Sequence, residues 1–375
     1  MVAKLSNLPH SDDLDVVTLS RLFDKTTNSY KFIFFLSLLE ILFKRQFQVA
    51  SPIELREIAI EMLAIAWYPS VVFKLSFGLQ DAIAKKLESL NLDVDNRFLE
   101  LTKNDKTFLR EEINKQYVND DLTRYVPFRL LRPFFKEIRG VKDQEVNKQL
   151  KIFASFFFET RKPLYCFAKD DLSIIFHPEW ALYIKKNYRI ILAWVCWKWL
   201  EYMQKHNSNV PSLANKLFPP QGSRQQMQSQ TSYWKLVIQN CEELKCIYSD
   251  QPLLVNNFSL DHYLPWTFVA HNQLWNLVPT KREINSSKSN KLPADIYFEK
   301  FVKIQHLGLM TSYRKMQPKI WNKYIECYIT DLKFPNKNEL LSFEKLEKGY
   351  ELQMKPLIAL AVSQGFGNDW LYHQT

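Results

Sequence analysis

The sequence predicts a mainly α-helical protein with a large helical N-terminal part and a small strand-containing module that C-terminal helices brace. Three observations predict this class. Only 7 of 375 residues are glycine, which is typical of helix-rich chains with few tight turns. Hydrophobic residues make up 46% of the chain, which is enough for packed cores. The length exceeds the usual size of a single core, so we expect two domains.

Residues 1–217 carry helical patterns. Ser51-Pro52-Ile53-Glu54 is a capping-box pattern with proline at the first helical position, and it predicts a helix that runs toward Trp67. A long amphipathic helix is expected from Pro178, and it contains Trp194, Trp197 and Trp199. Tryptophans at helical spacing usually lie in the core, because their apolar area is large.

A change in composition at Phe218-Pro219-Pro220-Gln221-Gly222-Ser223 predicts a linker over 218–232. The predicted domains are therefore 1–217 and 233–375. In the second domain we expect a helix over 233–244, then short strands, and helices again after Pro293.

Basic residues outnumber acidic ones by 50 to 40, which gives a formal charge of +10. This excess is suited to a polyanionic partner, or it forms an ordinary solvated surface. A basic stretch over 124–162 includes Arg129, Arg132 and Lys136, which are candidate nucleic-acid contacts. Interleaved phenylalanines either stack on bases or belong to the core, and the core interpretation is favoured. We expect the helical domain to bind nucleic acid or a protein partner.

Several classes are disfavoured. The glycines form neither a dinucleotide-binding nor a P-loop pattern. The five cysteines show no C-x-x-C spacing, so neither a disulfide framework nor a zinc ribbon is implied, and a reducing cytoplasm is the expected compartment. No apolar signal segment follows Met1, and the apolar stretches 30–43 and 190–200 are too short to span a membrane. We therefore expect no membrane partner.

The most informative segment covers residues 260–293. It contains the pair Asp261-His262, Asn276 fifteen residues after Asp261, and Asn285 nine residues further on. Lys288 and the closing Leu292-Pro293 complete an ordered set. This set resembles the HNH (His-Me finger, ββα-metal) endonucleases, in the variant that has asparagine at the last motif position.

Local patterns independently predict a strand, loop, strand and helix here. Strands are expected over 258–262 and 275–279. Thr280 and Glu283 form a T-x-x-E pattern that predicts a helix beginning at Lys281. The resemblance thus implies a ββα-metal module with its core at 246–293.

The motif residues have roles in phosphodiester hydrolysis. His262 would deprotonate the attacking water, and Asp261 and Asn285 would hold a divalent ion. Their hard oxygen atoms favour Mg²⁺ or Mn²⁺. The resemblance further implies that Asn276, assigned here to the catalytic set, pins the loop that positions His262. Taken singly, each of these residues also has an ordinary structural interpretation as a core, cap or turn residue.

The same helix supplies candidate nucleic-acid contacts. Lys288 lies three residues after Asn285, hence on the same helix face, and the resemblance implies that it touches a phosphate. Lys281 and Arg282 are predicted to contact nucleic acid beside it. No structural zinc is expected, because Cys246-Ile247-Tyr248-Ser249 keeps only the first cysteine of the paired knuckles found in many members.

The leading hypothesis is a DNA-cleaving enzyme, and the resemblance alone implies restriction or phage defence as its context. The alternative is a nucleic-acid-binding or scaffold subunit of a larger assembly, whose HNH module is silent until a partner activates it. RNA is a third possibility for the substrate.

Overall fold

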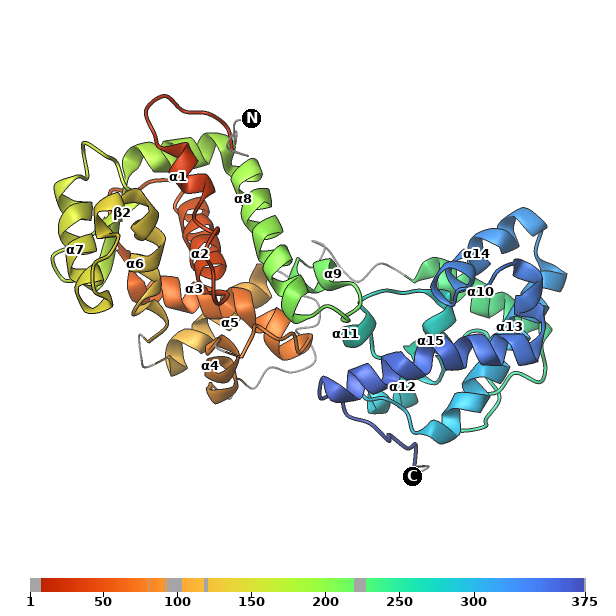
Figure 1. Ribbon diagram of the computed structural model, residues 1–375. Helices are drawn as coiled ribbons and strands as arrows, with labels where there is room; N and C mark the ends of the chain where they lie inside the picture. The colour runs from red at the N-terminus through yellow and green to blue at the C-terminus, as the bar shows by residue number, and fades with distance from the viewer. Residues whose placement is uncertain are drawn as a thin grey trace. The chain divides into compact units, whose positions relative to one another are not determined.

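The computed structural model describes residues 8–79, 81–90, 92, 103–117, 121–218 and 227–373. The chain divides into two compact units, Met1–Ser208 and Asn209–Thr375 (Figure 1). Helices dominate both units, which confirms the mainly α-helical class.

Unit 1 is built from helices around a small sheet. Its elements are α1 (Val16–Ser20), α2 (Tyr30–Lys44), β1 (Ile53–Glu54), α3 (Leu55–Trp67), α4 (Ile83–Ser89), α5 (Lys103–Gln116), α6 (Val126–Leu131), α7 (Asp143–Phe156), β2 (Tyr165–Phe167), β3 (Ser173–Phe176) and α8 (Pro178–His206).

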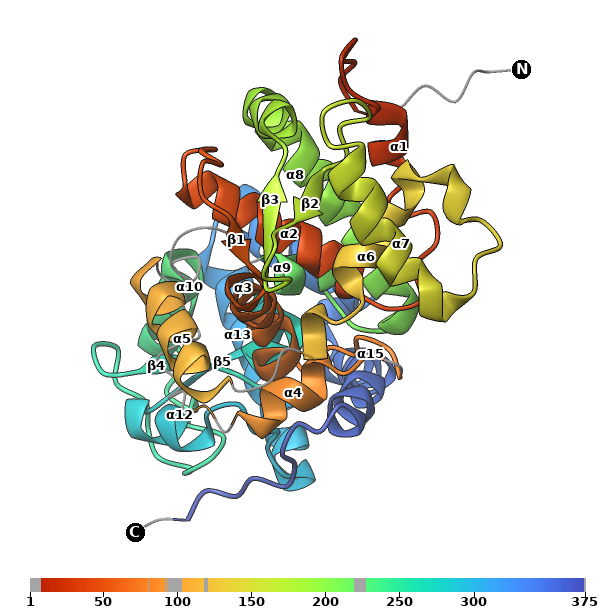
Figure 2. The same cartoon turned by 90° about the vertical axis from the view of Figure 1, so that its left-hand side faces the viewer.

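The three strands of unit 1 form an antiparallel sheet in the order β1-β3-β2 (Figure 2). Ile53 pairs with Ile174, so Ile53 and Glu54 belong to a strand and α3 begins at Leu55. The helix predicted toward Trp67 exists, but the capping box at Ser51 does not form. Pairing with a strand that is distant in sequence overrides this local signal, because a buried ladder satisfies the backbone groups of Ile53 and Glu54.

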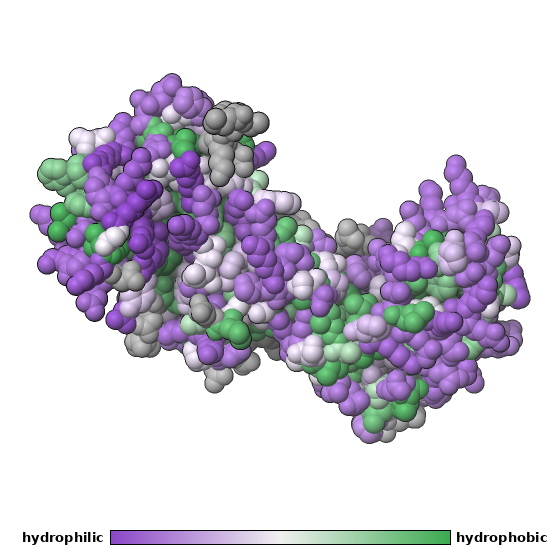
Figure 3. All heavy atoms as spheres, in the orientation of Figure 1, coloured by the Kyte–Doolittle hydropathy of each residue, from purple (hydrophilic) through white to green (hydrophobic). Residues whose placement is uncertain are grey.

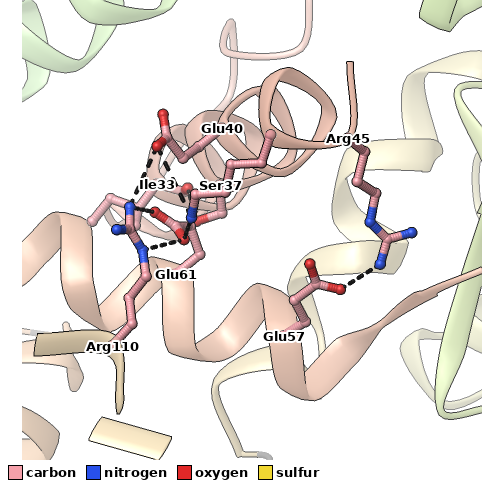
Figure 4. Close-up of polar contacts among 8 residues, drawn as sticks. Ile33, Ser37, Glu40, Arg45, Glu57, Glu61 and Arg110 are labelled. Carbon is pink, nitrogen blue, oxygen red and sulfur yellow. Dashed lines mark hydrogen bonds and ion pairs between the residues drawn. The ribbon is translucent and has the colours of Figure 1, made fainter. Parts of the chain in front are cut away.

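A buried ion-pair network joins three helices of unit 1 (Figure 4). Glu61 on α3 is 3% exposed. It accepts two hydrogen bonds from the Arg110 guanidinium, at 2.8 and 2.7 Å, and one from Lys44 Nζ at 2.7 Å. Burial acts to raise the pKa of Glu61, but Arg110 and Lys44 lower it below its ordinary value. The network thereby ties α2 and α5 to α3 with a charged carboxylate.

The long helix α8 begins at Pro178, as predicted. Trp194 and Trp199 are 8% and 1% exposed, so they belong to the core. Trp197 is different, since 59% of it is exposed and its indole N–H donates to Glu201 at 2.9 Å. The core prediction therefore holds for two of these three tryptophans.

Two of the phenylalanines in the basic stretch of unit 1 are buried. Phe128 and Phe135 are 9% and 2% exposed, which confirms the core interpretation for them. Arg132 and Lys136 are exposed, whereas Arg129 is half-buried.

Unit 2 contains α9 (Leu213–Leu217), α10 (Gln228–Asn240), β4 (Ser259–His262), α11 (Trp266–Val269), β5 (Leu277–Thr280), α12 (Arg282–Lys288), α13 (Phe298–Lys315), α14 (Pro318–Asp331) and α15 (Phe343–Ser363). The predicted first domain, residues 1–217, includes α9, whereas α9 lies in unit 2 of the structure. Within the predicted linker, 219–226 fall outside the described residues, and α10 begins at Gln228 rather than at Tyr233.

The C-terminal helices hold strand β5 and the turn before it through buried side chains. Gln305 of α13 donates to the Leu277 carbonyl at 2.9 Å, and Tyr328 of α14 donates to Gln305 at 2.6 Å. Tyr350 of α15 donates to the Trp275 carbonyl at 2.9 Å. These contacts confirm that the helices after Pro293 brace the small module.

Hydrophilic residues cover most of the face shown in Figure 3, with separate hydrophobic patches on each unit. In the described ranges, no helix has both the length and the apolar character needed to cross a membrane.

Candidate functional site

The motif residues lie on one hairpin and the helix that follows it. Strands β4 and β5 pair antiparallel, with Asp261 opposite Val278 and His262 opposite Leu277. Helix α12 follows β5 directly, begins at Arg282 with Lys281 as its N-cap residue, and lies against β4 (Figure 2). The predicted strand, strand and helix are all present. The T-x-x-E box does not form, because the Thr280 hydroxyl lies 3.2 Å from Cys246 Sγ instead.

Asp261 is a buried carboxylate with partners on both oxygens. It is 2% exposed. Its Oδ1 accepts from Lys288 Nζ at 3.0 Å, and its Oδ2 accepts from the Tyr248 hydroxyl at 2.6 Å. Burial raises the pKa of Asp261, while the charge of Lys288 and the bond from Tyr248 oppose this shift. The rings of Tyr297 and Trp370 pack edge-on against Tyr248 and fix it in place.

Lys288 has a place that the sequence did not predict. Its side chain is fully buried, and Nζ also donates to the His262 carbonyl at 2.7 Å. Burial lowers the pKa of Lys288, against the effect of the Asp261 charge. The structure does not present Lys288 to a phosphate, because its ammonium is enclosed and bonded to Asp261 and to the His262 carbonyl. The shared helix face of Asn285 and Lys288 is confirmed, since both contact β4.

His262 lies at the end of β4 and is 9% exposed. Its Nε2 is 2.9 Å from the side-chain oxygen of Asn272. The ring is thus held at one edge by a residue outside the motif.

Asn276 is fully buried and joins the two ends of the loop between the strands. Its side-chain oxygen accepts from the Leu264 amide at 2.8 Å, and its NH₂ donates to the Leu264 carbonyl at 2.9 Å. Its own carbonyl accepts from the Tyr263 amide at 2.9 Å. These bonds fix the two residues that follow His262 in the sequence.

Asn285 is half-buried, and its NH₂ donates to the Leu260 carbonyl at 3.1 Å and to Ser259 Oγ at 3.3 Å. Its amide therefore lies beside the strand that carries Asp261. A carboxylate has about four acceptor positions, of which Asp261 uses two, and the amide oxygen of Asn285 is a second hard donor. Oxygen atoms of this kind are the ligands that hard divalent cations prefer. Within the described ranges, no group of three or more His, Cys, Asp or Glu side chains could hold a metal ion.

The two other predicted nucleic-acid contacts, at the start of α12, differ in exposure. Arg282 is exposed. Lys281 is half-buried and donates to the side-chain oxygen of Gln251.

Comparison with protein families identifies this region. The model of the HNH endonuclease family matches residues 246–294, which include β4, β5 and α12. The chain carries a domain of the HNH endonuclease family. An HNH domain indicates nuclease activity on a nucleic acid, and HNH nucleases generally use a divalent metal ion. Neither a curated protein nor a solved structure matches the chain.

The HNH domain contains site residues that sequence reasoning missed. Tyr248, which bonds Asp261, lies in the segment that was interpreted only as an incomplete cysteine knuckle. Asn272, which lies beside His262, occupies no motif position. The ring of the neighbouring His271 packs on Trp275, at 5.3 Å between ring centres, and burial lowers its pKa to about 4. No spacing rule distinguishes Tyr248 or Asn272.

Lys216 is a buried lysine near the HNH hairpin, and it makes stability depend on pH. Its Nζ donates to the Phe268 carbonyl at 2.5 Å, and burial lowers its pKa from 10.5 to about 7. Between these values the unfolded chain binds more protons than the folded one, so stability rises as pH rises from about 7 to about 10.5. Below about pH 7 both states are protonated and the contribution is constant.

We expect Lys216→Met to remove this rise. Urea unfolding at pH 7, 8 and 9 should show the free energy of unfolding rising less in the variant than in the wild type, by about 1 to 2 kcal/mol over the series. Lys323→Met, which changes an exposed lysine of α14, is the control and should retain the wild-type rise. Equal rises in the wild type and Lys216→Met would refute the assignment to Lys216.

Proposed function

We propose that the protein is a metal-dependent endonuclease that hydrolyses phosphodiester bonds in DNA, with Asp261, His262 and Asn285 at its active centre. The observation that carries the proposal is that Asp261 and His262 end one strand of a hairpin within the segment that matches the HNH family, while Asn285 on α12 contacts the same strand. We further propose restriction or phage defence as the context and the cytoplasm as the compartment; all five cysteines are free thiols, as a reducing compartment would keep them.

In this proposal His262 accepts the proton of the attacking water, and Asn276 is a positioning residue that holds the turn after His262. Asp261 and Asn285 would hold Mg²⁺ or Mn²⁺, since both offer hard oxygen atoms. A divalent ion in such a site supplies positive charge to the phosphate and the leaving 3′ oxygen. The hydrogen bonds that Lys288 and Tyr248 donate orient the Asp261 carboxylate.

The test is a cleavage assay with two substrates. Purified full-length protein is incubated with supercoiled plasmid DNA and with a long single-stranded RNA, each with Mg²⁺, with Mn²⁺ and with excess chelator. We expect nicking of the plasmid that needs the metal, because one HNH centre cuts one strand at a time. Cleavage of RNA alone would contradict DNA as the substrate.

A second candidate function is a binding or scaffold subunit whose HNH domain is silent until a partner activates it. One observation favours it: Asp261 is 2% exposed and bonded on both oxygens. In that case the isolated chain binds DNA but leaves it intact under all metal conditions. Adding a cell extract from the source organism would then start cleavage that Asp261→Asn protein does not support.

The basic stretch of unit 1 is the proposed nucleic-acid contact surface. Lys31 lies near this stretch. Burial lowers the pKa of Lys31 to about 8, and the charges of Arg129 and Arg132 add to this shift. Such mutual repulsion between cations would be relieved by a phosphate. The same unit is also the proposed site for a protein partner.

We expect the combined variant Arg129→Gln, Arg132→Glu and Lys136→Glu to bind DNA more weakly and with less dependence on salt. The slope of log K against log salt concentration should become shallower by about 0.9 for each phosphate that the variant no longer neutralises. Fluorescence anisotropy with a labelled duplex measures this slope. The matched control, Lys185→Glu, Lys186→Glu and Arg189→Glu, changes exposed charges on α8. An unchanged slope in the first variant means that the stretch is only a solvated surface.

A further inference from the structure

The His262 ring is held by a side chain that lies outside the HNH motif. Asn272 follows His262 by ten residues, in the loop between α11 and the turn before β5, and its Oδ1 is 2.9 Å from His262 Nε2. With Asn272 Oδ1 as the acceptor, Nε2 would carry the ring proton and Nδ1 would be the basic nitrogen.

The loop that carries Asn272 is itself anchored. The Gln230 side chain, from α10, donates to the Asn272 backbone carbonyl at 3.0 Å. On the other side, the Gln273 amide donates to His271 Nδ1 at 3.3 Å, and the His271 ring packs on Trp275. Hydrogen bonds therefore hold both the backbone and the side chain of Asn272. A residue that orients another side chain must itself be held in place.

We propose that Asn272 is a positioning residue for catalysis, which selects the Nε2–H tautomer of His262 and directs Nδ1 toward the attacking water, and that Gln230 holds Asn272 for this task. This inference rests on the proposed function, since it needs His262 to act as the base. The arrangement has the general form of a base oriented by a third group.

Steady-state cleavage of plasmid DNA by the full chain tests this inference. Asn272→Ala should lower kcat by about ten- to hundredfold, the loss that removing the hydrogen-bond partner of a metal-ligating histidine typically causes, while KM stays the same. Asn272→Asp keeps an acceptor at this position and should recover most of the rate. Gln230→Ala should cause a smaller loss, and Gln239→Ala, which changes an exposed glutamine of the same helix, should leave the rate unchanged.

A double-mutant cycle separates positioning from a general structural role. If Asn272 acts through His262, then adding Asn272→Ala to His262→Ala protein should cause almost no further loss. Losses that multiply would overturn the inference, and so would an unchanged kcat in Asn272→Ala when His262→Ala is inactive. Full activity of His262→Ala alone would instead overturn the proposed function, and this inference with it.

A measurement that does not depend on turnover tests the tautomer of His262 directly. Nitrogen-15 NMR of the histidine rings distinguishes the two neutral tautomers. The wild-type His262 signal should show the Nε2–H form, and Asn272→Leu should show a mixture. A wild-type His262 in the Nδ1–H form would overturn the inference.

Discussion

His262→Ala should lower the rate of metal-dependent DNA cleavage by about 10²- to 10⁴-fold, the usual contribution of a general base. His262 is the last residue of β4, in unit 2, and is 9% exposed. Its loss removes the proposed base and leaves the proposed binding surface of unit 1 intact. DNA affinity should therefore stay the same. Single-turnover kinetics and anisotropy measure the two quantities.

His10→Ala is the control for this prediction, because His10 is an exposed histidine of unit 1. It should cleave at the wild-type rate. A His262→Ala rate within about threefold of the wild type would show that another group accepts the proton, since such a difference is far below a general-base effect.

Lys288→Met should destabilise the HNH domain by about 3–5 kcal/mol, the usual effect of removing one partner from a buried ion pair. The Asp261 carboxylate would stay enclosed without its counter-charge, and the His262 carbonyl would lose its donor. Urea unfolding of the full chain measures the loss. The salt dependence of DNA binding should not change, because the ammonium of Lys288 is buried away from solvent.

A double variant makes this prediction sharper. Lys288→Met combined with Asp261→Asn removes both charges, so it should be more stable than Lys288→Met alone. If Lys288→Met instead kept wild-type stability and lowered the salt slope by about one, Lys288 would be a phosphate contact.

The sequence predicted the secondary-structure elements that carry the motif residues, because these follow from local rules. Asp261 and His262 fall at the end of a short strand, and Asn276 precedes the next strand. Antiparallel pairing then brings these residues together. Asn285 and Lys288 share a helix face because they are three residues apart.

Other features depend on contacts between distant segments, and no local pattern predicts them. The strand at Ile53 exists because it pairs with Ile174, and the T-x-x-E pattern at Thr280 fails because Cys246 lies beside its hydroxyl. Lysine is almost never fully buried unless it is paired, so the default expectation for Lys288 was the surface. Only the fold shows that Asp261 is its partner.

The most direct test of the account is whether the buried carboxylate at the end of β4 is needed for metal-dependent cleavage. Wild-type protein and Asp261→Asn, which keeps the shape of the side chain and an acceptor for Tyr248, are compared in plasmid nicking at increasing Mg²⁺. We expect cleavage by the wild type that rises with Mg²⁺, and none by a folded Asp261→Asn protein. Equal cleavage by both proteins would contradict a role of Asp261 in catalysis.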